Sequence, residues 1–165
     1  MHLTALQDLY LSCNVRLSLP DSIGQLAALQ TLKLTMCAKL MTLPDSIGLL
    51  TALSVLSLGC GGALNGNSLK SVPDSIGKQT NSESSSLDGH AGLAVLPDSI
   101  GHLTALQMLD LFQCRGLVGF PDGIGYLTAL RRLNLLDCRG LVGLPDSIGH
   151  LTALQTLDLD RKSVV

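Results

Sequence analysis

The sequence is poor in aromatic residues: it has no tryptophan, two tyrosines and two phenylalanines among its 165 residues. A globular core usually depends on aromatic side chains for bulk, so this chain must fill its interior in another way. Charged residues make up only 15% of the chain, which argues against a highly charged disordered protein. The net charge of −2 gives no electrostatic reason to expect nucleic acid or an anionic membrane as a partner.

Long apolar runs are missing as well. Thr, Ser, Asp or Gly interrupts every leucine-rich stretch before about 18 apolar residues accumulate, so we expect no membrane insertion. The N-terminus has no basic segment followed by an apolar block, and the chain has no Asn-x-Ser/Thr site. Its five cysteines are an odd number. Together these features favour a reducing, cytoplasmic location.

Leucine is abundant instead, and it recurs with a fixed period. It accounts for 38 of the 165 residues, and the six prolines lie 24, 29, 24, 24 and 24 residues apart. An aspartate follows every proline; five copies read Pro-Asp-Ser-Ile-Gly, and the copy at Pro121 reads Pro-Asp-Gly-Ile-Gly. The cleanest unit runs from Leu96 to Leu117 and reads LPDSIGHLTALQMLDLFQCRGL. This self-similarity predicts a stack of like coils.

Each part of the unit indicates a particular local structure. Leu109 and Leu111 are two residues apart, so both face the same side of a short strand. Proline suits the first position of a helical turn, and the aspartate after it lies where the helix dipole favours an anion. One unit is therefore a strand, a bend and about one helical turn on the opposite side. A single unit leaves its leucines exposed, whereas stacked units bury them.

The unit resembles the leucine-rich repeat, L-x-x-L-x-L-x-x-N/C-x-L, over nearly the whole chain. The version Leu-Pro-Asp-Ser-Ile-Gly-x-Leu-Thr-Ala-Leu is most similar to repeats of intracellular plant-type disease-resistance (nucleotide-binding leucine-rich-repeat) receptors and of Ras-pathway scaffold-like leucine-rich-repeat proteins. The resemblance implies an α/β right-handed solenoid of about seven 24-residue coils. Its curved parallel sheet lies on the concave face and its short helical turns lie on the convex face. Strands are expected at residues 9–11, 32–34, 56–58, 85–87, 109–111, 133–135 and 157–159.

We expect a single domain over residues 1–165, with two irregularities. The Gly-rich stretch 59–68 holds five extra residues and lacks a phosphate-binding motif, so we interpret it as an inserted loop. In the fourth unit, about 73–96, Gln79, Ser82 and Ser85 stand where other units have leucine. Either this unit is stacked but poorly packed, or it is looped out. Neither end has a polar capping unit, which favours a fragment of a longer protein with flanking domains.

Reactive side chains form no catalytic or metal-binding set in this sequence. Cys37, Cys114 and Cys138 occupy the Asn/Cys position of the repeat, which turns inward in the family, so we interpret them as buried thiols. A disulfide between Cys114 and Cys138 is the alternative, because their coils are adjacent. A zinc site needs four ligands around one point, whereas these cysteines form a line. The repeated Ser-Asp pairs are copies of one structural turn. We therefore predict no enzyme activity, no cofactor and no metal.

The residues that vary between units lie beside each Leu-x-Leu pair, on the exposed side of the predicted sheet. Met108, Phe112 and Leu136 lie there among charged residues, and an apolar centre with a charged rim is typical of a protein-binding surface. The sequence thus predicts a non-catalytic protein–protein recognition module that binds a protein or peptide through the concave face. The candidate contact residues are Tyr10, Lys33, Met108, Asp110, Phe112, Arg132, Asn134, Leu136, Asp158 and Asp160.

The resemblance further implies the sensing region of an innate-immune or signalling receptor, by analogy of fold. Two alternatives stay open. One is a targeting or scaffold domain attached to an enzyme, such as a kinase, GTPase or ubiquitin ligase, that is encoded outside this chain. The other is a structural repeat fragment, which the irregular fourth unit and the missing caps favour.

Overall fold

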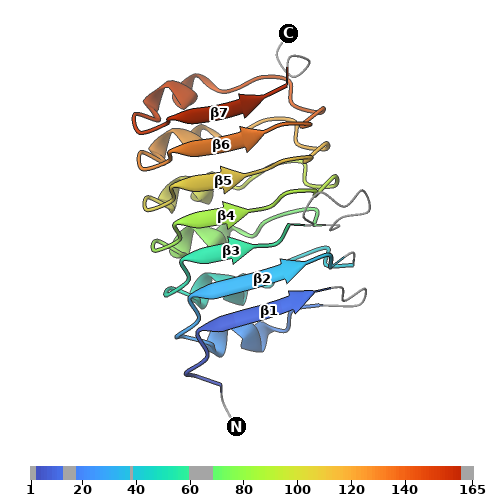
Figure 1. Cartoon of the computed structure of the whole chain (residues 1–165), viewed down its shortest axis with the longest axis vertical. Coiled ribbons are helices and arrows are strands. Elements are labelled where there is room, and N and C mark those ends of the chain that lie inside the picture. Colours follow the sequence, from blue (N-terminus) through green and yellow to red (C-terminus); the bar gives the residue numbers. More distant parts are fainter. Residues whose placement is uncertain (1–2, 13–17, 38, 60–68, 161–165) are drawn as a thin grey trace.

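The computed structural model describes residues 3–12, 18–37, 39–59 and 69–160. Its strands form one sheet of seven parallel strands, and neighbours in the sheet are neighbours in the sequence (Figure 1). The strands are β1 (Asp8–Ser12), β2 (Thr31–Thr35), β3 (Val55–Ser57), β4 (Ser84–Ser86), β5 (Met108–Asp110), β6 (Arg132–Leu135) and β7 (Thr156–Leu159). The strands predicted from the leucine pairs are confirmed, and their ends differ from the prediction by at most one residue.

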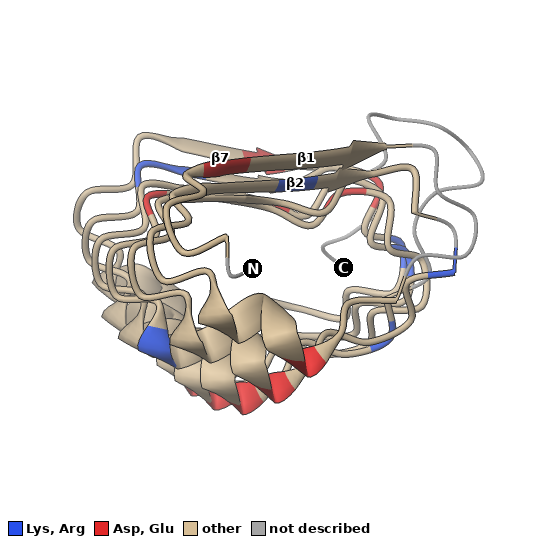
Figure 2. Ribbon diagram, turned by 90° about the horizontal axis from the view of Figure 1, so that it is seen from below, with Lys and Arg blue, Asp and Glu red and all other residues tan. Residues whose placement is uncertain are grey.

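Short 3-10 helices cover the side opposite the sheet (Figure 2). They are η1 (Asp21–Gln25), η2 (Asp45–Leu49), η3 (Asp74–Lys78), η4 (Asp98–His102), η5 (Asp122–Tyr126) and η6 (Asp146–His150). Each follows a proline with extended backbone, as at Pro97 with φ −70° and ψ 152°, and begins with the predicted aspartate. The expected helical turns are thus present as tight 3-10 turns, which suit such short helices. Sheet and turns together confirm the solenoid architecture.

The core between sheet and turns is built almost wholly of leucine and isoleucine. Strand register places Leu109 beside Leu133, and Leu133 beside Leu157. Leu109 and Leu133 are completely buried, whereas Leu157, in the last strand, is 38% exposed. Full burial of one leucine stabilises the fold by roughly 2 kcal/mol. A leucine therefore contributes its full share only when a coil lies on each side of it.

The glycine that ends each Pro-Asp-Ser-Ile-Gly turn marks the closest approach of neighbouring coils. A Cβ atom on Gly101 would lie 2.3 Å from the carbonyl oxygen of Gly123 in the next turn. The equivalent glycine of the last turn, Gly149, would have no atom of the described residues within 4 Å of its Cβ. This glycine is therefore required by the stacking of coils.

The fourth unit is stacked between its neighbours despite its polar residues. Ser85 lies opposite Leu56 in β3 and opposite Leu109 in β5. Gln79 and Ser82 are also buried at positions that hold leucine in other coils. Gln79 Nε2 donates to the carbonyl oxygen of Ile47 at 2.8 Å, but among the described residues Gln79 Oε1 and Ser82 Oγ have no hydrogen-bond partner. The coil thus keeps its backbone pairing with a weaker core.

Two expectations about organisation concern the inserted loop and the domain boundaries. Residues 60–68 of the expected inserted loop lie outside the described ranges. The single domain over 1–165, and its place within a longer protein, stay predictions.

Replacing Gly101 with alanine should lower the free energy of unfolding by about 1–3 kcal/mol, because the new methyl group collides with the backbone of the next coil. Gly149→Ala is the matched control, since the same turn glycine has open space there. Urea unfolding followed by circular dichroism measures both. Equal losses in the two variants would contradict the stacking explanation.

Ser85→Leu should raise the free energy of unfolding by about 1–2 kcal/mol, because it restores the leucine between Leu56 and Leu109. Ser84→Leu, one residue earlier on the outer face, serves as the control and should change stability by less than about 0.5 kcal/mol. Thermal and urea unfolding of both variants test this. A destabilised Ser85→Leu protein would mean that the coil has closed around the smaller side chain.

Candidate binding surface on the sheet

The outer face of the sheet carries the residues that vary between coils. Register aligns them in columns across the strands: Met108 lies beside Arg132, Asp110 beside Asn134, and Asn134 beside Asp158. None of the ten predicted contact residues is buried. The structure divides them into two groups. Tyr10 and Lys33 lie in β1 and β2, and the other eight lie in β5, β6 and β7 or within two residues after them.

The smaller group is a cation–aromatic pair. Lys33 Nζ lies 5.6 Å from the centre of the Tyr10 ring, within the range of a cation–π interaction. Tyr10 is 61% exposed, so most of its ring remains accessible to a partner. Two intervening strands, β3 and β4, separate this pair from the larger group. Adjacent strands are about 4.8 Å apart, so β2 and β5 lie roughly 14 Å apart.

Two polar side chains in the larger group accept hydrogen bonds from the backbone near the ends of their own strands. Asp110 Oδ1 accepts hydrogen bonds from the backbone N–H of Phe112 at 3.0 Å and from Asn134 Nδ2 at 2.9 Å. Asn134 Oδ1 in turn accepts from the backbone N–H of Leu136 at 3.1 Å. These bonds fix the backbone of Phe112 and Leu136 just beyond the strands. Asp110 and Asn134 therefore act mainly as supports for the apolar residues beside them.

The surroundings of Asp110 act on the pKa of its carboxyl group in opposite directions. Burial raises the pKa of its carboxyl group, the N–H of Phe112 opposes that effect, and the nearby Asp88 carboxylate adds to the rise. Asp88 itself accepts a hydrogen bond from Ser86 Oγ at 2.6 Å. In the next two strands, Arg132 Nη2 of β6 and Asp158 Oδ2 of β7 form an ion pair at 2.8 Å. Because this pair is largely solvent-exposed, it contributes at most about 1 kcal/mol to stability.

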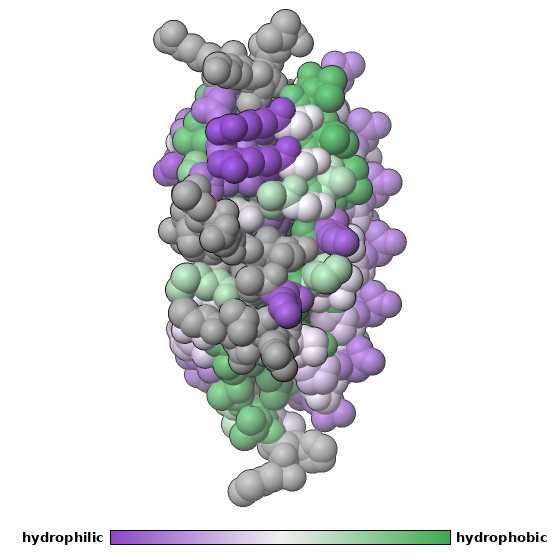
Figure 3. Space-filling view, turned by 90° about the vertical axis from the view of Figure 1, so that its right-hand side faces the viewer, coloured by the Kyte–Doolittle hydropathy of each residue, from purple (hydrophilic) through white to green (hydrophobic). Residues whose placement is uncertain are grey.

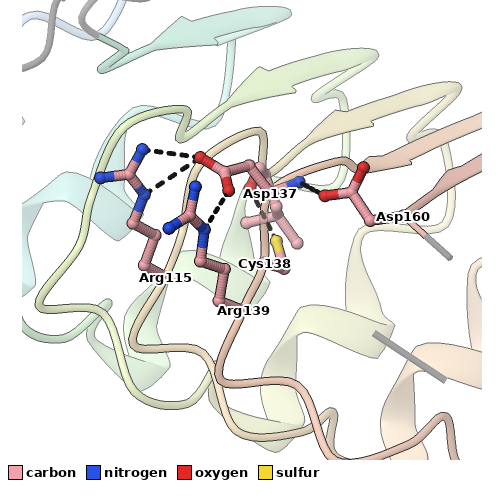
Figure 4. A network of polar contacts seen from close by, with 6 residues as sticks. Arg115, Asp137, Cys138, Arg139 and Asp160 are labelled. Atoms are coloured by element: carbon pink, nitrogen blue, oxygen red, sulfur yellow. Dashed lines mark hydrogen bonds and ion pairs between the residues drawn. The ribbon is translucent and has the colours of Figure 1, made fainter. Parts of the chain in front are cut away.

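A second polar network lies where the chain leaves the strands and was missed by the sequence analysis (Figure 4). Arg115 donates to Asp137 Oδ2 through Nε and Nη2, at 3.0 and 2.7 Å, and Arg139 Nε donates to Asp137 Oδ1. These bonds lower the pKa of Asp137. The backbone N–H of Asp137 donates to the carboxylate of Asp160, which ties that candidate residue to the scaffold. The signal was present in the sequence, since Cys-Arg-Gly occurs in two successive coils at 114–116 and 138–140.

The described cysteines, Cys37, Cys114 and Cys138, are buried, and no disulfide joins Cys114 to Cys138. Cys114 Sγ donates to the carbonyl oxygen of Leu87, and Cys138 Sγ to that of Leu111, each at 3.1 Å. Each acceptor belongs to the preceding coil, so these thiols link neighbouring coils.

Burial raises the pKa of Cys138 to about 11 and raises that of Cys114 as well. Both thiols are therefore protonated near neutral pH and are poor nucleophiles. His90 takes the same repeat position in the fourth coil, which the sequence analysis did not notice. Its Nδ1 accepts from the backbone N–H of Leu69 at 3.2 Å.

The described part of the chain offers little for other chemistry. Within it, no group of three or more His, Cys, Asp and Glu side chains could hold a metal ion. Nor does any helix in these ranges have the length and apolar character to cross a bilayer.

No protein-family model and no curated protein matches the chain. A leucine-rich-repeat protein of Leptospira interrogans is 29% identical, with a TM-score of 0.61 over 98% of this chain and 50% of that one. The plant peptide hormone receptor RGFR1, in complex with RGF2, is 26% identical, with a TM-score of 0.55 over 95% of this chain and 32% of the receptor. The leucine-rich repeat domain of the type III effector XopL is 24% identical, with a TM-score of 0.53 over 95% of this chain and 70% of that domain.

These similar structures come from bacterial as well as plant proteins, so they support the general repeat class and do not single out the plant-type receptors. This chain spans about half the length of the Leptospira protein and about a third of the plant receptor. The register of its seven strands and the buried leucine rows agree with that class. The chain has the fold of a leucine-rich-repeat solenoid.

Proposed function

We propose that this chain is a non-catalytic recognition module that binds a protein or peptide through the outer face of its sheet, centred on β5 and β6. The main support is the larger group of sheet residues. Met108 is 41% exposed, and Phe112 and Leu136 are partly exposed further along the same face, beyond Asp110 and Asn134. Arg132 lies beside Met108 and pairs with Asp158. Such a surface suits a partner that buries apolar side chains on Met108, Phe112 and Leu136 and offers polar or charged groups to the residues beside them.

Rigidity of the site supports the same proposal. Strand pairing fixes the backbone of β5 and β6, and Asp110 and Asn134 hold the residues that follow. A site whose backbone is already ordered loses little conformational entropy when it binds. The proposed roles are therefore distinct: Met108, Phe112 and Leu136 contact the partner, while Asp110 and Asn134 position two of them.

The Arg132–Asp158 pair and the distant Tyr10–Lys33 pair complete the proposed footprint. Arg132 is 54% exposed, so it can exchange its partner for a carboxylate of the ligand without large loss. An extended peptide advances about 3.3 Å per residue, so roughly five residues would span the 14 Å from β2 to β5. The footprint thus fits an extended segment that runs across the strands.

The solved complex of the plant receptor with RGF2 supports a peptide or protein as the ligand class. Within this proposal the chain is the sensing region of a cytoplasmic innate-immune or signalling receptor, most like plant-type disease-resistance receptors, with flanking domains in a longer chain. The alternative is a targeting or scaffold domain for an enzyme encoded outside it. The buried polar residues of the fourth coil favour a third possibility, a structural repeat fragment.

A combined Met108→Ser and Arg132→Gln variant tests the proposed surface. Peptides are first selected from a displayed library on the wild-type protein, and their dissociation constants are then measured by isothermal titration calorimetry. The variant should raise the dissociation constant by at least about tenfold, because it removes both an apolar contact and a rim charge.

The matched control is Leu49→Ser with Tyr126→Ser, which removes two exposed apolar side chains from the opposite side, in η2 and η5. Circular dichroism confirms that each variant is folded. Unchanged affinity in the sheet variant, or an equal loss in the control, would refute the assignment of the sheet face.

A further inference from the structure

Exposed apolar side chains gather at a place other than the sheet. The segments that follow the last outer-face position of each coil (Ser12, Thr35, Gly59, Asp88, Phe112 and Leu136) and run to the next proline form one lateral edge of the solenoid, here called the exit edge. In the described residues they are 18–19, 36–37, 39–43, 69–72, 89–96, 113–120 and 137–144. Eleven large apolar residues are exposed in the described chain, and five of them lie on this edge: Met36, Met41, Val95, Val118 and Val142. Val142, at 78%, is the most exposed of all.

Two of these residues, Val118 and Val142, are aligned along the stack. The backbone N–H of Val118 donates to the carbonyl oxygen of Ala94 at 3.0 Å, and that of Val142 donates to the carbonyl oxygen of Val118 at 3.2 Å. These bonds place Val142 directly beside Val118, and Val118 beside Ala94; Val95 is the next residue along the chain after Ala94. Figure 3 faces this edge and shows, toward the C-terminal coils, hydrophobic atoms in a column beside strongly hydrophilic ones.

The charge of the exit edge is opposite in sign to that of the whole chain. Its described segments carry four basic residues, Lys39, Lys70, Arg115 and Arg139, and a single acidic one, Asp137. Both arginines share that one carboxylate. Arg139 is 71% exposed and uses only Nε among its bonds to described residues. Its terminal nitrogens therefore remain available to an anionic partner.

We propose that the exit edge around Val118, Val142, Arg115 and Arg139 docks an amphipathic α-helix of a partner protein, with acidic residues along one flank of its apolar stripe. Coils repeat about every 4.8 Å and a helix turns every 5.4 Å, so successive turns of the helix meet the aligned residues Val118 and Val142. Glutamate or aspartate beside the stripe meets the two arginines. This surface is separate from the sheet face.

A helix suits this edge better than an anionic membrane. Each of the two aligned valines is followed, four residues later, by an exposed aspartate: Asp122 after Val118 and Asp146 after Val142. A helix about 10 Å wide can contact the valines and the arginines without covering the aspartates. A bilayer surface would also meet the row of turn carboxylates, which repel anionic lipids.

The experiment uses three synthetic 18-residue helical peptides, each labelled for fluorescence anisotropy. The first has a leucine stripe flanked by glutamate, the second has lysine in place of glutamate, and the third has serine in place of leucine. The wild-type protein should bind the first peptide at least tenfold more tightly than either of the others. Its affinity should fall as salt is raised, because the arginine contacts are screened.

Variants locate the contact. Val118→Ser with Val142→Ser should weaken the first peptide at least tenfold, and Lys70→Gln with Arg139→Gln should weaken it several-fold and reduce the salt dependence. Leu49→Ser with Tyr126→Ser removes the same number of exposed apolar side chains elsewhere and should leave the affinity unchanged. Met108→Ser with Arg132→Gln should also leave it unchanged, which separates this surface from the sheet face.

Four results would overturn the proposal. They are no binding of the glutamate peptide to the wild-type protein, equal binding of the lysine peptide, equal weakening by the Leu49 and Tyr126 control, and a preference for lipid. The lipid probe is a vesicle of phosphatidylserine and phosphatidylcholine. The edge would be assigned to membranes if the two valine substitutions abolished binding to the vesicles and left binding to the peptide unchanged.

Discussion

Every feature of this molecule depends on the close stacking of one coil on the next. A leucine such as Leu109 is fully buried because equivalent residues lie on both sides of it. The same contact demands glycine in the turns, since a side chain there would meet the backbone of the next coil. It also explains the buried thiols of Cys114 and Cys138, which bond to the carbonyl oxygens of the preceding coil. Stacking thus fixes residue type at many positions in each unit.

That constraint is also what made much of the fold predictable. A period of 24 residues and the leucine pairs predict the strands, their order and the buried row, because each unit repeats the same contact. The fourth coil was undecided from sequence, since Gln79, Ser82 and Ser85 remove the apolar signal. Strand pairing on both sides of β4 keeps it in place. Backbone hydrogen bonds with neighbours do not depend on side-chain type, and local composition does not reveal them.

The candidate site was predictable in outline and less so in the role of each residue. Variation beside the leucine pairs correctly placed the ten residues on exposed or half-exposed positions. It gave no sign that Asp110 and Asn134 bond to the backbone two residues ahead, because such bonds depend on where a strand ends. The contact of Arg115 and Arg139 with Asp137 joins side chains from adjacent coils. A search along one unit misses it, whereas a comparison of equivalent positions in successive units would reveal it.

A solenoid can carry separate surfaces because each coil contributes independent columns of residues. On the sheet face the polar groups largely satisfy one another, as Asp110 does with Asn134 and Arg132 with Asp158. A partner there must replace or preserve these bonds. We therefore expect the polar groups to favour correct over incorrect partners more than they strengthen binding. On the exit edge the valines are exposed without such bonds, and burying them is favourable without loss of an existing contact. The two proposed surfaces therefore differ in kind: recognition at the sheet would depend on polar bonds that are already made, whereas recognition at the edge would depend on exposed valines and on the charges of Arg115 and Arg139.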